Sequence, residues 1–89
     1  MTKENLELME REAGDCIDSM MQSVNSVNET ATEQDVISGE DVELDLYYLG
    51  AFETLMRILN TLPEYTDGTF ARSERLDDFY SFCLGQEVQ

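Results

Sequence analysis

The sequence predicts an all-α protein, a small antiparallel unit of three main helices in a single acidic domain over residues 1–89. Apolar residues recur at spacings of three and four along three long segments, which is the periodicity of an amphipathic helix. Pro63 and Gly85 follow the second and third of these segments, at positions where helices commonly stop. No segment shows the alternation of a convincing strand. A chain of 89 residues is long enough for one domain and too short for two.

The first helix is expected from about Lys3 to Val27, with Thr2 as its N-cap. One face carries the apolar residues at helical spacing, namely Leu6, Met9, Ala13, Cys16, Ile17, Met20, Val24 and Val27. Leu8 breaks the pattern, because it points away from that face. At 1.5 Å per residue this helix is roughly 37 Å long.

An acidic connection, residues 28–41, leads from the first helix to the second. Thr32 and Asp35 have the spacing that starts a helix. We therefore expect a short fourth helical turn near residues 32–38, with Gly39 as its stop.

The second main helix is expected from about Asp41, which is its cap, to Leu62, and Pro63 is its stop. Its apolar residues cover more than half of the helical wheel, so it is either the central helix or part of a dimer interface. Aromatic residues concentrate at such interfaces. The candidate residues for an oligomer interface are Tyr48, Phe52, Met56 and Phe82.

A turn is expected at residues 64–69, with Gly68 in its bend. The last helix is expected from about Ala71 to Leu84, and Gly85 is its stop. Its apolar residues stand at i, i+3, i+4 and i+7, namely Leu76, Phe79, Tyr80 and Cys83.

The charge balance restricts the kinds of partner. Twenty Asp and Glu residues face five Lys and Arg, with no His, for a formal net charge of −15. Such a chain is repelled by phosphates of nucleic acids and by anionic membrane surfaces, so direct binding to either is not expected. The natural complement is a cationic protein surface, such as that of a nucleic-acid-binding protein.

The net negative charge is concentrated in one stretch, residues 12–56, which contains no Lys or Arg and carries eleven carboxylates. We define this segment as the acidic stretch. A field of one sign along such a segment attracts cationic grooves. The candidate partner-binding residues are Asp15, Asp18, Glu29, Glu33, Asp35, Glu40, Asp41, Glu43 and Asp45.

The sequence offers no catalytic residues, metal site or cofactor motif. Without His, the usual general base and activator of nucleophiles are missing. Asp41, Glu43 and Asp45 alternate like the first ligands of a calcium-binding EF-hand loop. However, Leu46 and Phe52 take the places of the required Gly and Glu. Acids that favour the positive end of a helix dipole explain this pattern better. We therefore expect no enzyme and no cofactor.

Compartment signals favour the cytosol. The first residues, Met1 to Asn5, lack the apolar run of a signal peptide, and no segment is long and apolar enough to cross a membrane. Cys16 and Cys83 are too few for a disulfide framework, and both fall on apolar helix faces, as buried free thiols do.

Two hypotheses of function follow. In size and charge the chain is similar to the class of small acidic inhibitors that phages and plasmids use against restriction or CRISPR effectors. That similarity of composition implies a nucleic-acid mimic that occupies the basic surface of a nucleic-acid-processing protein. The alternative is a small homodimeric helical adaptor, chaperone or antitoxin-like protein, whose acidity serves only solvation.

Overall fold

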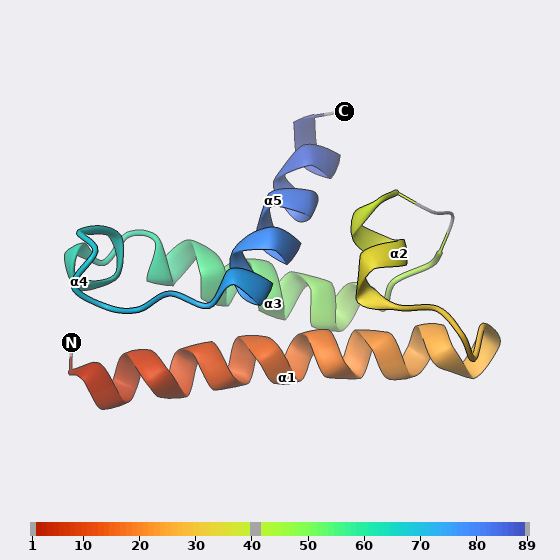
Figure 1. Ribbon diagram of the computed structural model, residues 1–89, viewed down its shortest axis with the longest axis horizontal. Coiled ribbons are helices and arrows are strands. Elements are labelled where there is room, and N and C mark those ends of the chain that lie inside the picture. The colour runs from red at the N-terminus through yellow and green to blue at the C-terminus, as the bar shows by residue number, and fades with distance from the viewer. Residues whose placement is uncertain (1, 40–41, 89) are drawn as a thin grey trace.

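The computed structural model describes residues 2–39 and 42–88, with side chains as far as Gly85. The helices are α1 (Lys3–Val27), α2 (Glu33–Ile37), α3 (Leu46–Leu59), α4 (Pro63–Thr66) and α5 (Glu74–Val88) (Figure 1). None of the described residues forms a strand. The prediction of an all-α protein is therefore confirmed.

The longest helix, α1, begins and ends as predicted. The Thr2 hydroxyl caps it by accepting a hydrogen bond from the Asn5 backbone N–H at 3.2 Å. The buried residues of α1 are Leu6, Ala13, Ile17, Met20 and Val24. Val27, the last residue of the predicted apolar face, is not part of the core, since it is 90% exposed. The last turn of α1 extends past the start of α3 (Figure 1).

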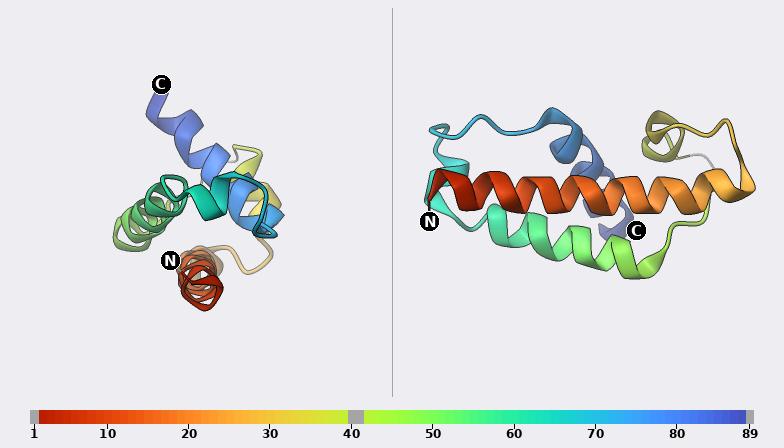
Figure 2. Two further views of the ribbon diagram at one scale, coloured as in Figure 1. Left: turned by 90° about the vertical axis from the view of Figure 1, so that its left-hand side faces the viewer. Right: turned by 90° about the horizontal axis from the view of Figure 1, so that it is seen from below.

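Helices α1 and α3 lie side by side and run antiparallel (Figures 1 and 2). By contrast, α5 crosses this pair at a steep angle in all three views instead of lying along it. The antiparallel arrangement of three helices is therefore not confirmed. The molecule is built on the antiparallel pair of α1 and α3, and α2, α4 and α5 lie together on one side of this pair (Figure 2).

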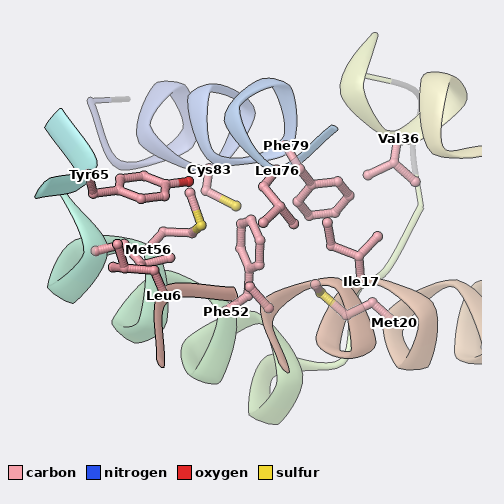
Figure 3. Close-up of a cluster of buried hydrophobic side chains, with 12 residues drawn as sticks. Leu6, Ile17, Met20, Val36, Phe52, Met56, Tyr65, Leu76, Phe79 and Cys83 are labelled. Atoms are coloured by element: carbon pink, nitrogen blue, oxygen red, sulfur yellow. The ribbon is translucent and has the colours of Figure 1, made fainter. Parts of the chain in front are cut away.

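The crossing helix completes the core (Figure 3). From α5, Phe79 packs edge-on against Phe52 of α3, with ring centroids 5.3 Å apart. Tyr65 of α4 and Val36 of α2 close the two ends of this cluster, and both are fully buried. Burying such side chains stabilises the fold by about 1.5–3 kcal/mol each. The short helices are thus held mainly by apolar contact.

The short helix α2 confirms the turn expected near residues 32–38. The Thr32 hydroxyl accepts from the Asp35 backbone N–H at 3.2 Å, and the Asp35 carboxylate accepts from the Thr32 backbone N–H at 2.8 Å. This reciprocal pair is a capping box. Gly39 follows with φ of 87°, the left-handed conformation that glycine adopts most readily.

The predicted start of the second main helix is wrong. Its cap is Asp45, whose carboxylate accepts a hydrogen bond from the Tyr47 backbone N–H at 3.0 Å, and Asp41 lies outside the described residues. Val42 and Leu44 are non-helical and pack against the core in that form. The helix starts later because these two apolar side chains reach the core without it.

The remaining helix ends also differ from prediction. Pro63 begins α4 at a position where its missing N–H costs nothing, so the expected turn contains a short helix. The last helix begins at Glu74 and continues through Gly85 to Val88. Gly85 does not have the positive φ with which a glycine stops a helix.

Tyr65 links α4 to α1 and to the start of α5. Its hydroxyl donates to Glu10 Oε2 at 2.9 Å, and the Ser73 backbone N–H donates to the same oxygen at 3.1 Å. The Arg72 guanidinium lies 4.6 Å from the centre of the Tyr65 ring, a cation–π contact. Burial raises the pKa of the Tyr65 phenol, and the hydrogen bond to Glu10 raises it further.

We expect Tyr65→Phe to lower the free energy of unfolding by about 1–2 kcal/mol at neutral pH, because one buried hydrogen bond is lost. The wild type should also lose stability above about pH 10, the ordinary pKa of a phenol. The folded pKa is raised, so this stabilisation is present below the unfolded pKa and disappears as pH rises through the folded value. Urea unfolding, followed by circular dichroism at a series of pH values, measures both effects.

Tyr47→Phe is the matched control, since the Tyr47 side chain is 77% exposed. If the free energy of unfolding falls equally at alkaline pH in the wild type and in Tyr65→Phe, this role of Tyr65 is contradicted.

Candidate functional site

Two of the candidate partner-binding carboxylates are joined by one cation. Arg75, at the start of α5, has its Nη2 2.5 Å from Asp18 Oδ1 of α1 and its Nε 2.8 Å from Glu33 Oε1 of α2. The hydrogen bond with Glu33, followed by that with Asp18, raises the pKa of Arg75. The charge of Arg75 therefore partly neutralises Asp18 and Glu33, and the two ion pairs join α5 to α1 and α2.

Two other candidates are used as helix caps. Asp35 completes the capping box of α2, and Asp45 caps α3. Both side chains are half-buried. A cap of this kind stabilises a helix by about 0.5–2 kcal/mol. These two carboxylates therefore have structural roles that the sequence analysis did not separate from partner binding.

The other described candidates are exposed but are not brought together. Asp15 lies on α1, Glu29 in the turn after α1, and Glu43 in the extended segment before α3. Glu40 and Asp41 lie outside the described residues. In the part of the chain that the structure describes, no three His, Cys, Asp or Glu side chains are placed to hold a metal ion.

We expect Arg75→Gln to lower the free energy of unfolding by about 1 kcal/mol, the scale of a partly exposed ion-pair network. The loss should shrink when salt screens the charges. Thermal or urea unfolding at low and high salt measures it. Arg11→Gln is the control, since it removes the same charge from an exposed position on α1. Equal losses in the two variants would show that net charge matters and the Arg75 contacts do not.

The candidate oligomer interface needs correction at two residues. Phe52 and Met56 are completely buried in the core of this chain, so neither presents a surface to a partner. Tyr48 and Phe82 are half-buried. The most exposed large apolar residues of α3 are instead in its first turn, where Leu46 is 80% and Tyr47 is 77% exposed, and Ile58 near the end of the helix is 43% exposed.

A groove runs between α1 and α3 on the flank of α1 opposite to Arg75. Its lining residues are Glu12, Cys16, Tyr47, Tyr48, Gly50, Ala51, Thr54 and Leu55, and we call it the α1–α3 groove. The Tyr47 ring meets the Tyr48 ring edge-on, with centroids 5.1 Å apart. Cys16 and Asp18 differ by about 200° around the helix. The groove is therefore remote from the ion pairs of Arg75.

A second, separate hollow lies farther along the same flank of α1. It is lined by Ser23, Val24, Val27, Asn28, Val42 and Glu43. Cys16 and Val27 are eleven residues apart, about three turns, so they face the same direction. Every residue that lines either hollow belongs to the acidic stretch, and none of them is Lys or Arg.

The apolar and acidic surroundings of the groove affect the thiol of Cys16. Burial raises the pKa of its thiol, and the nearby charges of Asp15 and Glu12 raise it further. Cys83, by contrast, is a free thiol in the core with 2% of its surface exposed. Cys16 is therefore the more accessible thiol and lies in the groove.

The α1–α3 groove was missed in the sequence analysis. The signal that could have found it is the second apolar stripe of α3, in which Tyr47, Ala51 and Leu55 are spaced by four residues. This stripe lies beside the core stripe of Phe52 and Met56. The width of the apolar face was recognised, but its division into a core stripe and a groove stripe depends on how α1 packs.

Comparisons of this chain with protein-family models, with curated proteins and with solved structures found no match. Among the described residues, no helix is both long and apolar enough to cross a membrane. The proposals that follow therefore rest on the geometry and charges of this chain.

Proposed function

We propose that this chain is a non-catalytic binding protein, which uses the acidic stretch to occupy a basic surface of another protein. The preferred form is an inhibitor or nucleic-acid mimic that blocks a nucleic-acid-processing protein, as anti-defence proteins of phages and plasmids do. The observation that supports this proposal is the placement of cations. Arg75 neutralises only Asp18 and Glu33, and the stretch itself contains no Lys or Arg.

The exposed carboxylates of the stretch have a physical effect on a cationic partner. Asp15, Glu29 and Glu43 are solvent-exposed. They contribute to a negative field that reaches about 10 Å at moderate salt and accelerates encounter with a positive surface. Because part of the acidity is used internally, these residues are the best targets for a test.

A second candidate function is a homodimeric adaptor, chaperone or antitoxin-like protein. The observation that favours it is the exposed apolar surface of Leu46 and Tyr47 on α3. In this case acidity serves only solubility, and binding should lose little when salt is added. A nucleic-acid mimic should bind much more weakly at high salt.

The first test is to capture partners from a bacterial lysate on the immobilised protein at low salt and to elute them with high salt. The proposal expects a basic nucleic-acid-binding protein, whose binding to nucleic acid the acidic chain then inhibits in a competition assay. A captured protein that resists high salt and keeps its nucleic-acid binding would contradict the proposal.

For the partner so obtained, we expect the triple variant Asp15→Asn, Glu29→Gln, Glu43→Gln to bind on the order of tenfold more weakly at about 0.1 M salt, because long-range attraction is reduced. The control is Glu4→Gln, Glu74→Gln, Asp78→Asn, which removes three exposed carboxylates outside the stretch. Equilibrium titration measures both variants. Equal weakening would mean that only net charge matters.

A further inference from the structure

We propose that the α1–α3 groove binds one amphipathic helix of a partner protein, with an apolar face in the groove and Lys or Arg residues along its flanks. This inference rests on the proposed function, because it names the kind of basic surface that the acidic stretch meets. It also differs from simple charge attraction, because the groove supplies apolar contact at a defined place.

The lining of the groove supports an apolar occupant. Tyr47 is 77% exposed, and the half-buried residues Cys16, Ala51 and Leu55 line the same groove. Exposed aromatic side chains beside partly buried apolar residues are typical of the centre of protein interfaces. Covering Tyr47 would remove from water the largest exposed apolar surface in the groove.

The charges around the groove select a cationic occupant. Glu12 lines the groove, and Glu43 lines the second hollow on the same flank of α1. Every described Lys and Arg lies outside this lining. A second copy of the chain would bring its own net charge of −15 and the same carboxylates to the contact. Like charges brought together oppose association, so a basic partner fits this surface better than a second copy does.

The shape of the groove favours a helix. It lies between α1 and α3, which run antiparallel (Figures 1 and 2), and its lining residues come from both helices. From Tyr47 to Leu55 the wall of α3 extends about 12 Å at 1.5 Å per residue, or about two turns. Adding an extended peptide as a strand would require an exposed sheet edge. None of the described residues forms a strand. A helix with apolar anchors at i, i+3, i+4 and i+7 also spans about two turns, the length of this wall of the groove.

The experiment uses the whole protein and three synthetic peptides of about 18 residues, long enough for five helical turns. The first peptide is an amphipathic helix with a Leu face and Lys flanks. The second has the same composition in scrambled order, without an apolar face, and the third carries Glu in place of Lys. Binding is measured by calorimetry at about 0.1 M and about 1 M salt, where the screening length falls from about 10 Å to about 3 Å.

We expect the basic amphipathic peptide to bind at least tenfold more tightly than the other two and to keep part of its affinity at high salt, because apolar burial is not screened. Tyr47→Ser should weaken this binding about tenfold, the loss expected when an interface anchor is removed. Leu46→Ser is the matched control, since Leu46 is the neighbouring residue, is 80% exposed and does not line the groove.

Cys16 reports the site directly. The basic peptide should slow alkylation of Cys16 in the wild type, and Cys83 is protected by the core in both states. Circular dichroism of Tyr47→Ser and Leu46→Ser establishes that both variants keep the wild-type helix content. The loss of peptide binding can then be assigned to the groove.

The other outcomes overturn the inference in distinguishable ways. Equal affinity for the amphipathic and the scrambled basic peptides would be compatible with the proposed function but would contradict the α1–α3 groove as the binding site. Failure of both basic peptides to bind at the lower salt would overturn the groove and the cation-binding surface together. Sedimentation that shows a dimer abolished by Tyr47→Ser would make the groove an interface between two copies.

Discussion

Repulsion among carboxylates is the constraint under which this fold is stable. With five cations and 20 acidic residues, ion pairs cannot neutralise the surface, so apolar burial must supply most of the stability. The two arginines near the start of α5 are accordingly placed where several segments meet. Arg75 contacts α1 and α2, and Arg72 contacts Asp77, Asn60 and the Tyr65 ring. Both fasten the crossing helix to the hairpin of α1 and α3.

The placement of these arginines gives the hairpin two unlike flanks. On the α5 side, Asp18 and Glu33 are paired with Arg75 and the surface is partly neutralised. On the opposite flank of α1, the groove and the hollow beyond it contain Glu12 and Glu43 but no cation. The asymmetry in the sequence, where the acidic stretch has no Lys or Arg, thus becomes an asymmetry between two faces of the molecule.

Local signals were sufficient to predict α1 and α2. Thr2 and the pair Thr32 and Asp35 act through hydrogen bonds within three residues, so sequence spacing alone identifies them. The start of α3 was ambiguous, because Asp41 and Asp45 are both good caps. The choice depended on Val42 and Leu44 packing against the core without a helix, which is a tertiary contact.

Tertiary contacts also decided what could be predicted of the site. Charge counting identified the acidic stretch, but it could not distinguish Asp15 from Asp18, which is paired with Arg75, 57 residues away in the sequence. Periodicity identified α3 as unusually apolar, yet it could not tell that Phe52 faces the core and Tyr47 faces water. The crossing angle of α5 follows from its contacts with Phe52 and Glu33, which no local pattern encodes.

Charge and apolar contact have different roles in the binding that we propose. Of the carboxylates in the acidic stretch, Asp18, Glu33, Asp35 and Asp45 already have structural partners. The exposed ones that remain are distributed over separate segments, an arrangement that attracts a cationic surface from a distance but defines no single contact. The α1–α3 groove is a single place with a defined direction. Electrostatic attraction would therefore set the rate of encounter, and burial of Tyr47 in the complex would set its lifetime.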